Sequence, residues 1–226
     1  MILITGAAGK TGQAIVRALA RQKADSQPTP ITIRAWVRRP EQIVLLQQLG
    51  ADEVFVGDLE DKANYAKACA DMAKIYHICP NMHPDEAKIG RLLIQAAQAA
   101  SVQHIVYHSV LHPQTEKMPH HWHKLRVEEM LFEAGIPTTI LQPTAYMQNI
   151  FGGWQSIIEQ GIYAVPYPVT TRLSLVDIND VAEVAAKVLL EAGHAGATYE
   201  LVGTEGLTQT AVANIPVSYT HLTLPT

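Results

Sequence analysis

Short apolar runs alternate along this chain with longer segments whose apolar residues recur every three or four positions. Runs of the first kind are typical of buried strands, and segments of the second kind are typical of helices that cover a core. The pattern predicts strands at 2–4, 31–37, 53–58, 74–80, 103–110 and 136–143 and helices at 11–21, 40–50, 61–71, 85–100 and 124–134. This alternation favours an α/β fold with a doubly wound parallel sheet, in which ligands bind at the carboxyl ends of the strands.

The pattern changes after residue 143. Residues 152–168 are rich in glycine, proline and aromatic side chains, as expected of a segment on the substrate side, and a predicted helix at 177–192 and strand at 197–203 follow. The last residues, PVSYTHLTLPT, do not continue this rhythm and are similar to translated sequencing-adaptor sequence. We therefore expect 216–226 to be a non-native tail and leave it out of the fold prediction.

Composition narrows the classes of function. The 226 residues are 48% apolar and 17% charged with a net charge of −4, which indicates a globular chain and gives no reason to expect nucleic-acid contact. No stretch reaches the roughly 18 apolar residues of a membrane helix, and Met1 leads directly into a predicted strand, which leaves no room for a signal peptide. Cys69 and Cys79 fall in predicted buried segments and form no disulfide framework. We therefore expect a cytoplasmic protein without membrane association.

The stretch ITGAAGKTG, residues 4–12, carries three glycines between a predicted strand and a predicted helix. Gly6 suits a tight turn, Gly9 the close approach of a ligand, and Gly12 the contact of helix against strand. A helix N-terminus offers unpaired N–H groups and a partial positive charge, so such a loop can bind a diphosphate. A plain glycine turn is the alternative, but the position between strand and helix favours the phosphate site.

The end of the second predicted strand, WVRRP, indicates which dinucleotide would bind. An acidic residue there would bind a ribose 2′-hydroxyl, whereas Arg38 and Arg39 supply guanidinium groups that match a 2′-phosphate. Lys10 adds positive charge within the glycine loop, so these residues favour NADP(H), unless one arginine is only a solvated loop residue. After the third strand, Asp58 is expected to accept from the adenine amino group and Leu59 to pack on the ring, with an exposed turn aspartate as the alternative.

Together these motifs resemble the short-chain dehydrogenase/reductase superfamily, and more narrowly its atypical NmrA-like branch. The resemblance extends to about residue 214 and rests on ITGAAGKTG, VRRP, GDLED, HHWHKLRVEEML, GIPTTILQPTAYMQN and SLVDINDVAEVAAKVL. It implies a Rossmann-type NAD(P)-binding domain at 1–150 and a partial C-terminal substrate lobe at 151–215 that is interleaved with the Rossmann core. Some members of the branch are reductases, and others are non-catalytic sensors of the nicotinamide redox ratio.

The resemblance also implies the residues that contact the ligands. The expected cofactor-binding residues are Gly6, Ala8, Gly9, Lys10, Thr11, Gly12, Arg38, Arg39, Asp58, Leu59, Cys79, Pro80, Ser109, Lys124, Pro143 and Thr144. The substrate is expected to contact Tyr146, Met147 and Asn149, although the first two are equally suited to ordinary core packing. Gln142 precedes Pro143 where the family usually has arginine.

The expected catalytic segment departs from the superfamily pattern. Classical members carry Tyr-x-x-x-Lys, in which the tyrosine transfers the proton and the lysine holds the nicotinamide ribose. Here Lys124 matches the lysine, and His120 stands where the tyrosine would be. Three possibilities stay open. In the first, Lys124, His120 or His123 is the general acid or base. In the second, Lys124 only binds the ribose, and hydride passes to an acceptor that needs no proton from the protein, such as a quinone. In the third, no reaction takes place and the site only reports cofactor binding. The two histidines are expected to lie in a loop.

The chain contains ten histidines, which raises the question of a metal site. His104, His108 and His112 are spaced by four residues, but the first two fall in a predicted strand. His120 and His123 lack an acidic third ligand nearby, so we expect no metal. A serine hydrolase is disfavoured because the sequence has no G-x-S-x-G segment.

The sequence thus supports two hypotheses of different classes. The leading one is an NADP(H)-dependent oxidoreductase that acts on a quinone, a carbonyl compound or a similar small acceptor. The alternative is a non-catalytic NADP(H)-sensing transcriptional or signalling regulator, which would bind a protein partner. The missing tyrosine weakens the first hypothesis without excluding it.

Overall fold

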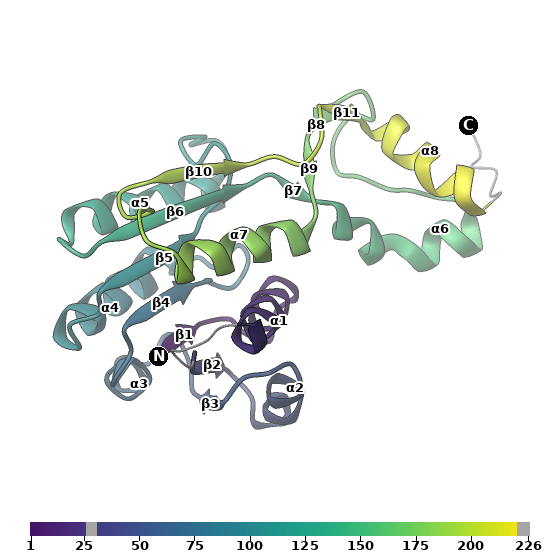
Figure 1. Cartoon of the computed structure of the whole chain (residues 1–226). Helices are drawn as coiled ribbons and strands as arrows, with labels where there is room; N and C mark the ends of the chain where they lie inside the picture. Colours follow the sequence, from purple (N-terminus) through teal and green to yellow (C-terminus); the bar gives the residue numbers. More distant parts are fainter. Residues whose placement is uncertain (26–30, 221–226) are drawn as a thin grey trace. The chain divides into compact units, whose positions relative to one another are not determined.

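The computed structural model describes residues 1–25 and 31–220, which form two compact units (Figure 1). The first unit contains Met1–Gln142 and Asn179–Glu200, and the second contains Pro143–Ile178 and the chain from Leu201 onward. Of the expected non-native tail, residues 221–226 lie outside the described residues, whereas 216–220 belong to the last helix. The proposed division at residues 150 and 215 stays a prediction.

A seven-stranded sheet forms the centre of the first unit, within the described part of the chain. Its spatial order is β10-β6-β5-β4-β1-β2-β3. The strands are β1 (Ile2–Ile4), β2 (Ile33–Val37), β3 (Glu53–Val56), β4 (Lys74–His77), β5 (His104–His108), β6 (Thr138–Pro143) and β10 (Thr198–Leu201). The pairings from β3 to β6 are all parallel, and the strand order reverses between β1 and β4. The sheet is therefore the predicted doubly wound type, with its switch point at the carboxyl end of β1.

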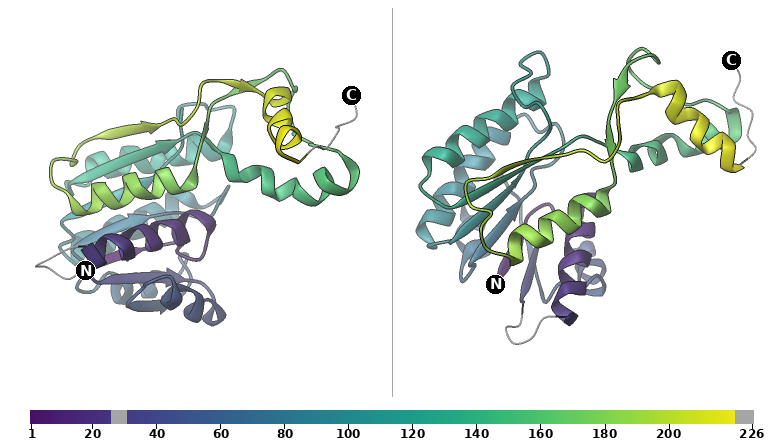
Figure 2. Two further views of the ribbon diagram at one scale, coloured as in Figure 1. Left: turned by 45° about the vertical axis from the view of Figure 1, so that its right-hand side comes forward. Right: turned by 45° about the horizontal axis from the view of Figure 1, so that its top comes forward.

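Helices cover both faces of this sheet (Figure 2). They are α1 (Lys10–Asp25), η1 (Pro40–Gln42), α2 (Ile43–Gln48), α3 (Lys62–Cys69), α4 (Glu86–Ala99), α5 (Pro119–Glu133) and α7 (Ile178–Leu190). One core cluster joins Tyr65 of α3, Leu93 of α4 and Leu131 of α5 to the central strands. Since these side chains are at most 1% exposed, the helices fix the positions of the loops at the strand ends.

Helix α5 corrects the prediction for two candidate residues. It begins at Pro119 rather than at residue 124, so His120 and His123 are helical and do not lie in a loop. The physical reason is the extended backbone of Met118 followed by proline at the first helical position, where the missing N–H costs nothing. Because four residues separate His120 from Lys124, the two side chains share a face of this helix.

The second unit is built from short elements. They are β7 (Ala145–Tyr146), η2 (Met147–Gly153), α6 (Trp154–Gln160), β8 (Arg172–Leu173), β9 (Leu175–Val176), β11 (Leu207–Thr208) and α8 (Gln209–Thr220). Strand β7 pairs in parallel with β9, and β8 pairs antiparallel with β11. In the described ranges of either unit, no helix is long and apolar enough to cross a bilayer.

Candidate functional site

The glycine-rich turn joins β1 to α1 through close backbone contacts. Gly6 has a φ of +60°, and a Cβ added there would lie 2.9 Å from the carbonyl oxygen of Ile78. A Cβ on Gly12 would lie 2.5 Å from the carbonyl oxygen of Gly6. Both positions therefore exclude side chains, and the start of α1 packs directly against the end of the strand.

Gly9 differs from the other two glycines of this turn. A Cβ there would meet only the Gly6 carbonyl oxygen, at 3.3 Å, and otherwise open space. The Gly9 N–H already donates to that oxygen at 3.0 Å, so the turn closes on itself before α1 begins. Open space at a helix N-terminus is what close approach of a phosphate requires.

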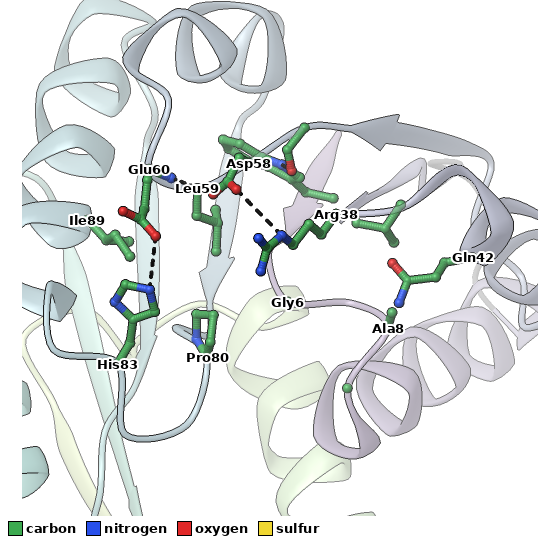
Figure 3. Close-up of a pocket in the computed structure, with 14 residues that line it drawn as sticks. Gly6, Ala8, Arg38, Gln42, Asp58, Leu59, Glu60, Pro80, His83 and Ile89 are labelled. Carbon is green, nitrogen blue, oxygen red and sulfur yellow. Dashed lines mark hydrogen bonds and ion pairs between the residues drawn. The ribbon is translucent and has the colours of Figure 1, made fainter.

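A pocket of about 340 Å³ lies beside this turn (Figure 3). It is lined by Gly6, Ala8, Gly9, Trp36, Val37, Arg38, Gln42, Gly57, Asp58, Leu59, Glu60, Pro80, His83 and Ile89. These residues come mainly from the carboxyl ends of β1 to β4 and the loops that follow, where the doubly wound topology predicts a ligand. Of the sixteen residues predicted to bind the cofactor, seven line the pocket: Gly6, Ala8, Gly9, Arg38, Asp58, Leu59 and Pro80.

Arg38 is the predicted phosphate-binding residue that lines the pocket. Its Nε lies 3.5 Å from Oδ2 of Asp58, and 81% of its side chain is exposed (Figure 3). Because an exposed ion pair of this kind contributes little to stability, Arg38 can exchange the carboxylate for another anion at low cost. Arg39 is not among the lining residues, and its backbone N–H donates to Oε1 of Gln42 at 3.1 Å.

An aromatic side chain that the sequence did not indicate stabilises the pocket wall formed by the ends of β2 and β3. Trp36 is 1% exposed and donates from Nε1 to the carbonyl oxygen of Gly57 at 2.9 Å. The Phe55 and Tyr65 rings stand edge-on to it, with centroids 5.3 and 4.9 Å away. This packing fixes the carboxyl ends of both strands, which carry Arg38 and Asp58.

Glu60 and His83 form the opposite side of the pocket. Nε2 of His83 lies 3.2 Å from Oε1 of Glu60, which joins the loop after β3 to the loop after β4 (Figure 3). Nδ1 of the same ring accepts from the backbone N–H of Asp85 at 3.1 Å, just before α4. The two loops are thereby tied together beside Pro80.

Several predicted cofactor residues lie near the pocket without lining it. Lys10 and Thr11 form the first turn of α1, with Lys10 exposed and Thr11 half-buried. Cys79 is 4% exposed, and burial raises the pKa of its thiol, with the charge of Glu86 adding to the effect. Cys69 and Cys79 are both free.

The Lys124 side chain reaches from α5 to the carboxyl end of β5. Its Nζ donates to Oε1 of Glu86 at 2.7 Å and to the carbonyl oxygen of His108 at 3.1 Å. The hydroxyl of Tyr107 donates to the same Oε1 at 2.7 Å. Glu86 is completely buried, and burial followed by the charge of Glu86 raises the pKa of Tyr107. Three elements, α4, β5 and α5, therefore meet in one charged cluster.

Ser109, a further predicted cofactor residue, belongs to a neighbouring cluster. It is 2% exposed, and its hydroxyl donates to Oε1 of Glu128. Nε2 of Gln142 also donates to Glu128, at 3.0 and 3.1 Å from its two oxygens. Burial raises the pKa of Glu128, although these hydrogen bonds oppose the shift.

The strand histidines are neutral core residues. Nδ1 of His77 lies 2.9 Å from Oγ1 of Thr5, and Nδ1 of His108 lies 2.7 Å from the hydroxyl of Tyr76. Burial, followed by the charge of Lys124, lowers the pKa of each ring to about 3. His104 pairs with Oγ1 of Thr139 at 2.9 Å, and burial lowers its pKa to about 4. Across residues 1–25 and 31–220, no group of three or more His, Cys, Asp and Glu side chains is placed to hold a metal ion.

The histidines of α5 have a different environment. The ring of His120 stands edge-on to that of His121, with centroids 4.6 Å apart. Partial burial lowers the pKa of His120, and the neighbouring His121 adds to the shift. A neutral imidazole at physiological pH can accept a proton more readily than it can donate one.

The remaining predicted residues belong to the second unit. Pro143 opens that unit, and the Thr144 N–H donates to the carbonyl oxygen of Leu201 at 3.1 Å. Tyr146 ends β7, and Met147 and Asn149 lie in η2. They are all outside the pocket of the first unit.

Residues 1–220 match the NmrA-like family. The chain belongs to that family. It is 32% identical to quinone oxidoreductase 2 of Escherichia coli over 94% of this chain and 72% of the relative. It is also 28% identical to an NAD(P)H azoreductase of Xenophilus azovorans, over 99% of this chain and 78% of that protein.

Solved structures agree with this assignment. The NADPH-dependent quinone oxidoreductase of Escherichia coli, in complex with NADPH, superposes with a TM-score of 0.84 and 30% identity, over 98% of this chain and 76% of that one. The triphenylmethane reductase of Citrobacter sp., in complex with NADP(H), gives a TM-score of 0.84 and 27% identity, over 97% of this chain and 75% of that one. The family and the Rossmann-type fold predicted from the sequence are thus confirmed.

Proposed function

We propose that this chain is an NADP(H)-dependent oxidoreductase that reduces quinones and similar small acceptors. The observation that carries the proposal is the pocket beside the glycine-rich turn, with Arg38 at its wall, in a chain 32% identical to a quinone oxidoreductase. The small-acceptor class follows from the relatives, which include a quinone oxidoreductase and an azoreductase. A cytoplasmic location is part of the proposal and is supported by the two free buried cysteines.

The residues of the pocket fit a phosphorylated dinucleotide. The open space at Gly9 and the N–H groups of the first turn of α1 would receive the pyrophosphate. Arg38, with Gln42 beside it, would bind the 2′-phosphate through its exposed guanidinium group. Asp58 and Leu59 would contact the adenine. Pro80 and Ile89 give the pocket an apolar lining, which suits the uncharged parts of the dinucleotide.

The nicotinamide end of the site is proposed from the chain's own residues at the ends of β4, β5 and β6. Cys79 and Pro80 would lie near the central ribose, and Lys124 would donate a hydrogen bond to the second ribose. Ser109 can act only as an acceptor toward this ribose, because its hydroxyl group already donates its hydrogen bond to Glu128. The contacts of Pro143 and Thr144 with the nicotinamide, and of Tyr146, Met147 and Asn149 with the acceptor, stay predictions from the sequence.

Bound NADPH would supply a hydride to the acceptor. The chain's part in the reaction is then to position the two ligands and to let a proton reach the reduced acceptor. A quinone that receives a hydride becomes a hydroquinone anion, which takes its proton from water or from Lys124. His77 and His108 cannot supply it near neutral pH because burial holds both rings in the neutral form. The missing tyrosine is therefore compatible with reduction of a quinone.

The direct test is NADPH oxidation by the purified chain with a panel of quinones, azo dyes and aldehydes. We expect turnover with quinones that exceeds turnover with simple aldehydes, because an alkoxide needs a strong proton donor and a hydroquinone anion does not. Tight NADPH binding without turnover of any acceptor would contradict the proposal and would favour the sensing regulator instead.

A further inference from the structure

Glu86 is a buried carboxylate that the proposed reaction does not use. It is the first residue of α4, is completely buried, and holds the Lys124 ammonium and the Tyr107 hydroxyl on one oxygen, Oε1. Its second oxygen, Oε2, has no hydrogen-bond partner among the described residues. A buried charge with so few partners is costly, so its presence calls for a role beyond packing.

The contacts of Lys124 show what Glu86 does to it. Two of its three N–H groups are directed to Glu86 and to the carbonyl oxygen of His108, and the ammonium lies 5.4 Å from the Tyr107 ring centroid. Its side chain is 12% exposed, so the ammonium has little freedom to move. Within the described chain the third N–H is left for a ligand, at the carboxyl end of β5 where the fold binds ligands.

We propose that Glu86 is a positioning residue, which acts through Lys124 to fix the group that contacts the nicotinamide ribose. A charge-assisted hydrogen bond is about twice as strong as a neutral one, and Glu86 is placed on a helix that does not carry Lys124. The pair therefore ties α4 to α5 and to the end of β5 at the point where the lysine is needed. This inference rests on the proposed function, since it assumes that the dinucleotide extends from the pocket toward Lys124.

Glu86→Gln tests the inference because glutamine keeps the shape of the side chain and removes its charge. We expect NADPH binding, measured by calorimetry, to weaken about tenfold. Binding of adenosine 2′,5′-bisphosphate should stay within about twofold of wild type, because this fragment fills the pocket and lacks the nicotinamide ribose. A merely structural role for Glu86 would weaken both ligands alike, so equal losses, or no loss for NADPH, would overturn the inference.

Tyr107→Phe keeps the test decisive if E86Q does not fold, since it removes one hydroxyl and no charge. NADPH should then bind about threefold more weakly, with the fragment unaffected. Glu129→Gln is the matched control, because Glu129 lies on α5, the helix that carries Lys124, but is exposed and pairs with Arg126. A wild-type chain that fails to bind NADPH would contradict the proposed function, whereas wild-type binding with unchanged E86Q and Y107F affinities would contradict only the role of Glu86.

Discussion

Single residues decide the charge balance of the pocket. Arg38 and His83 are the basic side chains that line it, and Asp58 and Glu60 are acidic. Each acidic residue is paired, Asp58 with Arg38 and Glu60 with His83. A 2′-phosphate therefore competes with Asp58 for the same guanidinium group. The competition favours the phosphate, because a guanidinium fork matches it and the exposed ion pair is weak.

Arg38→Asp should weaken NADPH binding far more than NADH binding. We expect NADPH to bind roughly tenfold to a hundredfold more weakly, since a charge-assisted contact is lost and a repulsive one is gained. NADH, which has no 2′-phosphate, should change by about threefold or less. Competitive titration of the two cofactors measures the difference.

Arg17→Asp provides the control for general electrostatics, because Arg17 is exposed on α1 and does not line the pocket. It makes the same change in net charge at another surface position. Equal loss of NADPH and NADH binding in the Arg38 variant would show that the arginine does not select the phosphate.

At the scale of elements, hydrophobic periodicity predicted the strands and most helices well. The fold class, the order of elements and the glycine turn followed from local pattern, because each strand and helix carries its own period. Helix α5 begins five residues before the predicted start at residue 124, since no apolar repeat marks Pro119–His123. The predicted helix at 61–71 ends at Cys69, because Ala70 leaves the helical region and Asp71 has a φ of 65°.

Only part of the pocket lining could be predicted, because local pattern marks some of its residues and not others. Residues at the strand ends, such as Arg38 and Asp58, could be found from the family motifs. Gln42 and His83 face the pocket because separate loops meet there, and no local pattern marks them. The buried pair of Glu86 and Lys124 joins residues 38 positions apart in sequence, which only the packing of α4 on α5 brings together.

At the scale of the whole molecule, buried neutral histidines couple stability to pH. The folded-state pKa values of His77 and His108 are about 3 and that of His104 is about 4, all below the 6.5 of an exposed imidazole. Between about pH 3 and pH 6.5, the unfolded chain therefore binds more protons than the folded chain. Stability is complete above about pH 6.5 and is lost as the pH falls toward 3. Glu128, whose pKa is raised by burial, acts in the opposite sense but is a single group.

The free energy of unfolding should fall between pH 7 and pH 5 by about 2 kcal/mol for each of these histidines. Denaturant unfolding at both pH values measures it. His77→Gln should make this fall in the free energy of unfolding smaller by about the 2 kcal/mol expected for one histidine, because glutamine does not titrate. Stability that is constant or rises on acidification would contradict the burial of these rings in the neutral form.

The central claim is that the pocket at the carboxyl ends of β1 to β4 binds NADPH. Calorimetric titration of the wild-type chain and of Gly9→Val with NADPH tests it most directly, because a side chain at Gly9 enters open space and disturbs few contacts. We predict saturable one-to-one binding to the wild type and no detectable heat with the folded variant. Absence of heat with the wild type, or equal affinities for both chains, would contradict the account.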